Sequence, residues 1–289
     1  MKTELDCLPC IFRQVRRTLE YAGVNGDKGR MIMREAEAIL QTASLDTAPA
    51  RISTLIHRLI RRETRLDPYR TLKQKCNHMS LGLLPLMREI MRGAADPLDA
   101  GVRLAIAGNV IDFGIYDGFD LERSIQDSLR LPIPHTHFNS FSRALKESRR
   151  ILYLCDNAGE IVFDRVLIEL IRDMGTNVTA VVKGSPVIND ATAEDAASAG
   201  LYEVAAVIDN GSDGIGTLLE ACSEGFSAEY TGADMVISKG QANYETLTDE
   251  KDKRIFFLFK VKCPVVARTL GRPEGDIVLM ENQNTCLRR

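Results

Sequence analysis

The feature of this sequence that most constrains its fold is a change of pattern at residue 151. From there on, short β-branched apolar runs alternate with longer segments of helical spacing. This alternation predicts a largely parallel sheet covered by helices on both faces, because parallel neighbours need a crossover connection. Strands are expected at 151–155, 178–182, 204–208, 235–238, 264–267 and 277–280, with helices at 161–174, 191–199 and 215–222.

Residues before 151 follow a helical pattern, with apolar side chains at spacings of three and four. The pattern is clearest at 51–65, where aliphatic side chains form one stripe and arginines another, which is typical of a helix with a solvated basic face. Further helices are expected at 11–22, 29–42, 71–92, 97–110 and 139–148. The sequence therefore predicts an all-helical region at 1–148 and a three-layer α/β/α domain at 149–289, joined through 131–140.

The net charge of −3 is unevenly divided along the chain. Residues 1–150 hold 24 Lys and Arg against 18 Asp and Glu, whereas residues 151–289 hold 13 against 22. So small a basic excess, without interleaved aromatic residues, argues against nucleic acid as a partner. No apolar run approaches the roughly 18 residues that span a bilayer, and MKTELDCLPC does not read as a secretory signal. We expect a soluble, cytoplasmic protein without a membrane partner and make no prediction of its oligomeric state.

Polar residues follow directly after several predicted strands. Ligands bind beyond the carboxyl ends of the strands in such sheets, and carboxylate and amide oxygens suit Mg²⁺ or Mn²⁺, whereas zinc would require His and Cys. Asp156, Asn157 and Asp190 form the best ligand set. Lysines, backbone N–H groups and the helix starts expected after Gly159 and Gly216 would then hold phosphoryl oxygens. The polar stretches are DNAGE at 156–160, KGSPVIND at 183–190, DNGSDG at 209–214 and KGQANYE at 239–245.

The simplest alternative is that these Asp and Asn residues only cap helices. Four such loops at one edge of the sheet favour a ligand site over this alternative. A dinucleotide site would require G-x-G-x-x-G in the first strand-to-helix turn, which here is DNAGE, and GSDGIG at 211–216 follows a later strand. The sequence also lacks Walker, nucleophile-elbow and H-E-x-x-H motifs.

Taken together, these motifs resemble the family long called domain of unknown function 89, described as metal-dependent damage-control phosphatases. The resemblance covers nearly the whole chain and is strongest to the microbial branch with an N-terminal CxxC. It implies a helical region packed on a Rossmann-like α/β/α domain, with the active site at their interface. The matching stretches are CLPC at 7–10, DPYRTLKQKCN at 67–77, GNVID at 108–112, DNAGE at 156–160, Asn189-Asp190 and KGQANYE at 239–245.

The resemblance also implies roles for individual residues. Asp156, Asn157 and Asp190 would coordinate a divalent cation (Mn²⁺, Mg²⁺, Co²⁺ or Ni²⁺), which is the set that the strand ends indicate. The residues expected around the substrate are Lys239, Gly240, Asn243, Lys262 and Ser185, with Asn109 and Asp112 reaching in from the helical region. The implied reaction is hydrolysis of a phosphomonoester of a small metabolite: a sugar phosphate, a phosphorylated cofactor precursor or a damaged nucleotide.

The seven cysteines, an odd number, favour thiols or metal ligands over disulfides. Cys7 and Cys10 make half of a zinc site, which Cys76 and His78 would complete as a Cys₃His set. One alternative is a redox pair, because a helix start lowers a thiol pKa, and another is two buried thiols that pack the first helix. The sequence leaves these three interpretations open.

Two functions from other classes also stay open. An S-adenosylmethionine-dependent methyltransferase on the same sheet would want a glycine-rich turn after the first strand, which DNAGE does not supply. A non-catalytic metal- or nucleotide-binding protein would bind its ligand without turnover.

Overall fold

Six strands form one sheet in the computed structural model of this protein, which describes residues 1–110 and 121–282. They lie in the order β3-β2-β1-β4-β5-β6, and every neighbouring pair is parallel except β5 with β6. The chain therefore builds the sheet outward from β1 in one direction and from β4 in the other. Doubly wound sheets bind ligands at such a change of direction, which here lies between β1 and β4. The strands are β1 (Arg150–Leu154), β2 (Asn177–Val182), β3 (Ala206–Asp209), β4 (Met235–Lys239), β5 (Ile255–Lys260) and β6 (Ile277–Glu281).

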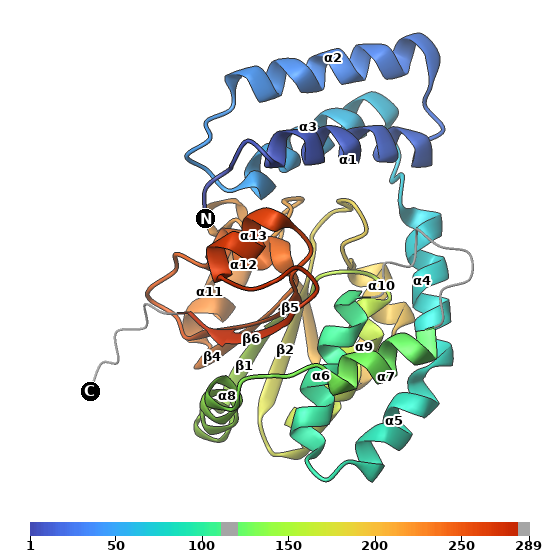
Figure 1. Ribbon diagram of the computed structural model, residues 1–289. Coiled ribbons are helices and arrows are strands. Elements are labelled where there is room, and N and C mark those ends of the chain that lie inside the picture. Colours follow the sequence, from blue (N-terminus) through green and yellow to red (C-terminus); the bar gives the residue numbers. More distant parts are fainter. Residues whose placement is uncertain (111–120, 283–289) are drawn as a thin grey trace.

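Thirteen α-helices surround this sheet in the described part of the chain, and the mixed α/β fold expected from the sequence is confirmed. Figure 1 shows α1, α2 and α3 as a separate layer above one edge of the sheet. None of the described helices is long and apolar enough to cross a membrane. The helices are α1 (Cys7–Tyr21), α2 (Gly26–Thr42), α3 (Pro49–Thr64), α4 (Arg70–Gly82), α5 (Leu84–Gly93), α6 (Pro97–Val110), α7 (Leu121–Arg130), α8 (His135–Glu147), α9 (Glu160–Asp173), α10 (Ala193–Ser198), α11 (Glu224–Gly232), α12 (Gln241–Leu247) and α13 (Pro264–Leu270).

Three large apolar cores, and a small fourth one between α3 and the strand-end loops, hold these layers together in the described part of the chain. On one face of the sheet, Tyr153 of β1 packs in a core with α9 and with α6 and α8 from the N-terminal half. On the other face, Leu152 packs with α11, α12 and α13, because successive strand residues point to opposite faces. Helices α1, α2 and α3 enclose a third core of their own. The helices of the N-terminal half thus belong to two different layers, one on the sheet and one above its edge.

Most predicted strands are present, but the expected strand at 264–267 is wrong. These residues begin α13, because Pro264 suits the first turn of a helix and the Cys263 Sγ accepts the Val266 N–H at 3.5 Å. The strand at this place in the sheet order is instead β5, whose apolar run is buried on both faces and so shows no alternation. The expected strand at 204–208 begins two residues late, at Ala206.

Several predicted helices also differ in their bounds. The expected helix at 71–92 is two helices, α4 and α5, because the chain turns at Leu83 and Pro85 begins the second. The helix expected at 215–222 is only a 3-10 turn at Leu219–Ala221, so Gly216 does not precede a helix start. The connector expected at 131–140 is shorter, since α8 begins at His135.

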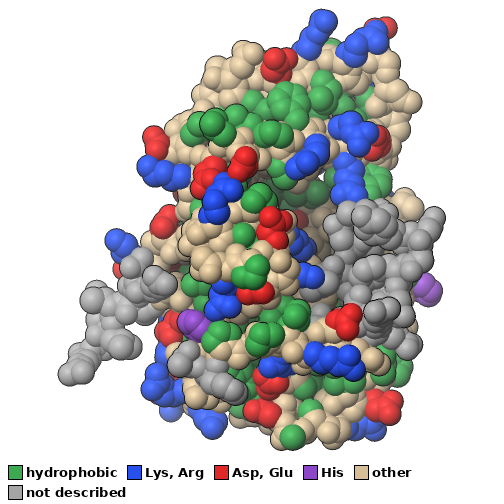
Figure 2. All heavy atoms as spheres, viewed as in Figure 1, with side chains coloured by type: hydrophobic (Ala, Val, Ile, Leu, Met, Phe, Trp, Pro, Cys, Tyr) green, Lys and Arg blue, Asp and Glu red, His purple; other side chains and the backbone are tan. Residues whose placement is uncertain are grey.

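Ion pairs between the two halves account for part of the charge asymmetry. Arg58 and Arg61 of α3 both pair with Asp213 in the loop after β3, with Arg58 Nε 2.9 Å from Asp213 Oδ1. Figure 2 shows Lys and Arg side chains interspersed with acidic ones along the boundary beneath the α1–α3 layer. Arg58 is exposed, as expected for a solvated basic face, whereas Arg61 is only partly exposed. Further pairs of the same polarity are Arg51–Glu220, Arg70–Glu194, Lys73–Asp195 and Arg88–Glu169.

Candidate active site

The loop after β1 and the loop after β2 meet at the carboxyl edge of the sheet. The backbone N–H of Ala158 donates to the Asn189 carbonyl at 2.9 Å, and that of Ala191 donates to the Asp156 carbonyl at 2.8 Å. These bonds place Asn157 opposite Asp190 in an isolated antiparallel bridge. The structure thus brings together the three residues that the sequence predicts as metal ligands.

Asp156 is buried and held by two side-chain amides. Its Oδ2 accepts from Asn109 Nδ2 at 3.0 Å and from Asn157 Nδ2 at 2.7 Å. Both amides also donate to Glu160 Oε2, each at 2.9 Å. Asn109 therefore reaches the site from α6, as the resemblance implies, whereas Asp112 lies outside the described residues.

The two predicted carboxylate ligands are both destabilised as anions. Burial raises the pKa of Asp156 well above its usual range, and the nearby charges of Glu160 and Asp190 add to the effect. Burial likewise raises the pKa of Asp190 to about 6, against the opposing charge of Lys183. Asp190 Oδ2 is buried and has no hydrogen-bond partner in the described chain, although Lys183 Nζ lies 3.4 Å away.

This donor set fits a divalent cation. Two buried carboxylates beside a third, with one carboxylate oxygen lacking a hydrogen bond, form an arrangement that a bound positive charge would stabilise. The amide of Asn157 adds a hard oxygen of the kind that Mg²⁺ and Mn²⁺ accept. No group of three or more His, Cys, Asp or Glu side chains in residues 1–110 and 121–282, these included, is arranged to hold a metal, so a cation here would rely on two carboxylates and the Asn157 amide.

Lys239 lies beneath these carboxylates instead of facing open space. It is fully buried, and its Nζ donates to Glu160 Oε1 at 2.7 Å, to Asp164 Oδ1 at 2.6 Å and to the Ala105 carbonyl at 2.8 Å. An ammonium group has three donors, so this set uses all of them. Although burial opposes it, the charges of Asp164 and Glu160 raise the pKa of Lys239. Lys239 thus fixes the position of Glu160.

Gly240 and Asn243, also predicted to lie around the substrate, shape the backbone at the end of β4. Gly240 has a φ of +81°, and a Cβ placed on it would lie 2.0 Å from Asp156 Oδ2. Asn243 donates to the Lys239 carbonyl at 2.7 Å and accepts from Thr217 Oγ1 at 2.8 Å. The glycine lets the chain pass close to the Asp156 carboxylate, and the asparagine holds the turn that follows β4.

Helix α4 holds the loop after β1 in place through residues that were not predicted as site residues from the sequence. Asn77 Oδ1 accepts from the Gly159 N–H at 2.6 Å, and Asn77 Nδ2 donates to Asp195 Oδ1 at 2.9 Å. Lys73 Nζ lies 3.1 Å from Asp195 Oδ2. The signal was present in the matching stretch DPYRTLKQKCN, which contains both Lys73 and Asn77.

Backbone strain is present in the loop that carries Asp190. Ile188 has a φ of +43°, a region that is unfavourable for a β-branched residue. It lines the same pocket as Asp190, two residues further on. The strained turn therefore lies where the second carboxylate is positioned.

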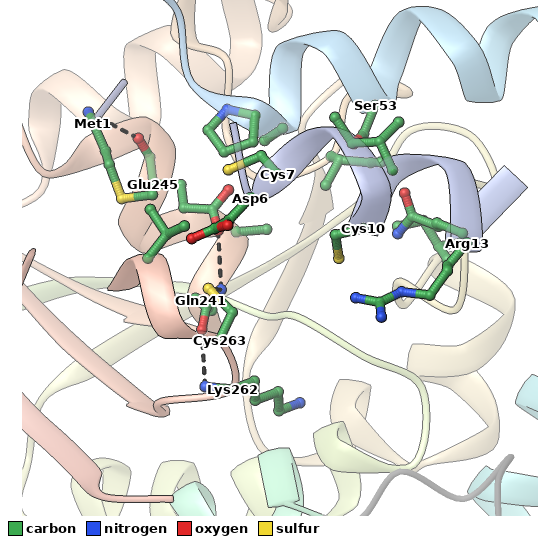
Figure 3. Close-up of a pocket in the computed structure, with 18 of the residues that line it drawn as sticks. Met1, Asp6, Cys7, Cys10, Arg13, Ser53, Gln241, Glu245, Lys262 and Cys263 are labelled. Atoms are coloured by element: carbon green, nitrogen blue, oxygen red, sulfur yellow. Dashed lines mark hydrogen bonds between the residues drawn. The ribbon is translucent and has the colours of Figure 1, made fainter. Parts of the chain in front are cut away.

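A pocket of about 480 Å³ opens above Asp156, Asn157 and Asp190, between the edge of the sheet and α1. Of the residues expected around the substrate, Lys262 lies in the pocket wall, whereas Ser185 is exposed and does not line the pocket. Figure 3 shows Cys10 and Arg13 of α1 pointing into this space, with Gln241 on the opposite side. Sequence reasoning named Cys10 only as a candidate zinc or redox thiol and missed Arg13, because spacing within α1 does not reveal which helix face covers the pocket.

The structure does not assemble the expected Cys₃His zinc site. Cys7 and Cys10 lie on α1 at the pocket, whereas Cys76 and His78 lie on α4. Cys76 is buried and His78 is exposed, because residues two apart on a helix point in different directions. Burial raises the pKa of Cys7, the opposite of what an activated redox thiol needs. The Cys7 and Cys10 thiols are both unpaired, Cys7 buried and Cys10 exposed.

Residues 3–278 match the family described as "Damage-control phosphatase ARMT1-like domain". This chain belongs to that family, also called DUF89. It is 35% identical over 287 residues to a damage-control phosphatase of Pyrococcus horikoshii, covering 98% of this chain and 99% of that one. The crystal structure of the Pyrococcus protein, a DUF89 family member, matches with a TM-score of 0.89 at 36% identity, over 98% of this chain and 100% of that one.

Two further relatives are similar over nearly their full length. A damage-control phosphatase of Archaeoglobus fulgidus is 36% identical over 283 residues, covering 96% of this chain and 98% of its own. An uncharacterized protein of Methanocaldococcus jannaschii is 41% identical over 292 residues, covering 97% and 96%. The family resemblance inferred from the motifs is thus confirmed, and the names of the Pyrococcus and Archaeoglobus relatives support a phosphatase role.

Proposed function

We propose that this protein is a metal-dependent phosphatase that hydrolyses phosphomonoesters of small metabolites. One observation carries the proposal: two buried carboxylates with raised pKa values, Asp156 and Asp190, form the floor of a metabolite-sized pocket in a phosphatase-family fold. Sugar phosphates, phosphorylated cofactor precursors and damaged nucleotides are the substrate classes to compare.

Asp156, Asn157 and Asp190 would hold the cation, with Mg²⁺, Mn²⁺, Co²⁺ or Ni²⁺ as candidates. When bound, the cation supplies positive charge that stabilises the transferring phosphoryl group. Asn109 and Asn157 orient the Asp156 carboxylate through their hydrogen bonds to its Oδ2. Gly240 leaves room for that carboxylate at the end of β4.

Lys262 is the residue best placed to meet the phosphate. It is exposed in the pocket wall. Burial raises the pKa of Asp156, and the charge of Lys262 opposes that rise, so Lys262 lies within electrostatic reach of the site. Its backbone N–H donates to Gln241 Oε1 at 3.0 Å, which fixes the loop after β5. Lys239 supports the site from below, since its donors are already bound to protein atoms.

A screen of phosphate esters tests this function. The purified protein would be assayed for phosphate release from members of the three substrate classes, with Mg²⁺, Mn²⁺, Co²⁺ and Ni²⁺ compared. We expect turnover of at least one class in the presence of one of these cations. Absence of phosphate release from every ester with every cation would contradict the proposal.

Removing either floor carboxylate should abolish activity. For Asp156→Ala and Asp190→Ala we expect phosphate release to fall by a factor of at least about a thousand, because the charge that holds the cation is lost. Circular dichroism would establish that both variants are folded. Asp46→Ala, which removes an exposed carboxylate that does not line the pocket, is the matched control and should retain wild-type turnover. Undiminished activity of Asp156→Ala or Asp190→Ala would contradict the assignment of that residue to the site.

A further inference from the structure

Two cationic side chains without an ion-pair partner face the pocket. Arg13 on α1 and Lys262 after β5 reach into the same space from opposite walls (Figure 3). Neither forms an ion pair with another residue in the described ranges 1–110 and 121–282. By contrast Arg16, one turn along α1, pairs with Glu20 at 2.7 Å. Arg13 is therefore available to a ligand in a way that its neighbour is not.

The two cations occupy different parts of the pocket. Lys262 lines the pocket from the loop after β5, at the carboxyl edge of the sheet where Asp156 and Asp190 form the floor. Arg13 belongs to α1, the helix that roofs the pocket, and reaches in from the wall opposite Lys262 (Figure 3). A ligand whose phosphate lies near Lys262 would therefore meet Arg13 with another of its groups.

The acids in the pocket wall do not satisfy Arg13. Asp6 pairs with Arg268 at 2.7 Å, and Asp190 lies 3.4 Å from Lys183. Glu274 is exposed at the rim and, like Arg13, forms no ion pair within the described residues. The guanidinium group is left with its planar fork of N–H donors open to the pocket, a geometry that matches carboxylate and phosphate groups.

We propose that this pocket selects phosphomonoesters that carry a second anionic group, with the phosphoryl group at Lys262 and the floor carboxylates and the second anion at Arg13. The inference rests on the proposed phosphatase function and names its substrate class. A volume of about 480 Å³ suits a single small metabolite of this kind.

The test compares substrates that differ only in the second group. Phosphogluconate and sorbitol phosphate, phosphorylated at the same carbon, differ by a carboxylate. We expect wild-type kcat/KM to favour phosphogluconate by about 10- to 100-fold, the range for a hydrogen bond between charged groups. Arg13→Gln should reduce this ratio towards one, mainly through KM, and Arg13→Lys should keep an intermediate ratio. A second pair, fructose bisphosphate against fructose phosphate, shows whether a phosphate serves better as the second anion.

Arg16→Gln is the matched control, because it removes the same charge from the same helix outside the pocket, and it should keep the wild-type ratio. Arg13 is exposed, so its substitution should leave the fold intact. The same pairs would be titrated calorimetrically into the protein as purified, which measures the preference even if no ester is turned over. Equal affinity and turnover within each pair, or a ratio unchanged by Arg13→Gln, would overturn the inference while leaving the phosphatase function standing.

Discussion

Some residues at this site face the pocket, and others hold the pocket residues in position. Lys239 and Lys262 show the difference most clearly, since the motif resemblance implies that both lie near the phosphate. Lys239 is completely buried with all three donors used by protein atoms, whereas Lys262 is exposed in the pocket wall. Sequence alone could not separate them, because the same residue type serves both purposes.

Replacing the buried lysine should unfold the site, whereas replacing the exposed one should not. We expect Lys239→Met to lower the free energy of unfolding by about 3–5 kcal/mol, because Glu160 and Asp164 would be left as uncompensated buried carboxylates. Lys262→Met should change it by less than about 0.5 kcal/mol and should instead raise KM. Urea denaturation measures the first effect, and equal stability of the two variants would contradict the division of roles.

Gly240 offers a test of how closely the backbone approaches Asp156. Gly240→Ala places a Cβ 2.0 Å from Asp156 Oδ2, so the carboxylate must move and phosphate release should fall by a factor of about a hundred or more. Gly271→Ala is the matched control, because Gly271 also has a positive φ, of +62°, but nothing lies within 4 Å of the added Cβ. Gly271→Ala should lose about 1 kcal/mol of stability from its left-handed backbone, and Gly240→Ala should lose more, because its φ of +81° and ψ of 157° are tolerated almost only by glycine. Equal activity of the two variants would show that the contact is unimportant.

At the scale of elements, α3 joins the α1–α3 layer to the strand-end loops. Its aliphatic face lies in the core that α1, α2 and α3 share, while its other face meets the loop after β3. There the Ile215 N–H donates to Thr54 Oγ1 at 2.9 Å, next to the pairs of Arg58 and Arg61 with Asp213. Polar contacts thus fasten this layer above the pocket.

Asp213→Asn should loosen this attachment. Burial would raise the pKa of Asp213, but the hydrogen bond from Arg58 and the charges of both arginines hold it below its usual value. A lowered pKa means that the contribution to stability is complete above about pH 4, the ordinary range for an aspartate, and is lost as the pH falls through the folded-state pKa. We expect the variant to be about 1 kcal/mol less stable at pH 7, and the gap to shrink in high salt.

Thermal unfolding of wild type and Asp213→Asn between pH 2 and 8 measures this effect. Asp27→Asn breaks an exposed pair on α2 and should leave stability nearly unchanged. A stability difference that persists undiminished at the acid end of the range would show that charge pairing is not its source.

At the scale of the whole molecule, the sequence predicted the sheet and the polar residues at its carboxyl edge better than it predicted how the helices pack around the sheet. That Asp156, Asn157 and Asp190 lie together could be predicted because polar residues at strand ends share one edge. The roof of the pocket was missed, since only the packing of α1 over that edge brings Arg13 there. The strand β5 was missed because burial on both faces removes the alternation that identifies a strand.

The uneven charge of the two halves also gains a structural meaning. Basic residues of the N-terminal half pair with acidic residues of the C-terminal half at several points, such as Arg70 with Glu194. Part of the charge asymmetry is thus used in ion pairs that hold the layers together. Arg13 is a basic residue of the N-terminal half that lines the pocket and forms no such pair within the described residues.

Removal and return of the metal tests the central claim most directly. The wild-type protein would be treated with excess chelator, dialysed, and assayed for phosphate release as Mn²⁺ is added back. We predict loss of activity on chelation, recovery with Mn²⁺, and no recovery in Asp190→Asn treated in the same way. Full phosphatase activity in the continued presence of excess chelator would contradict the account.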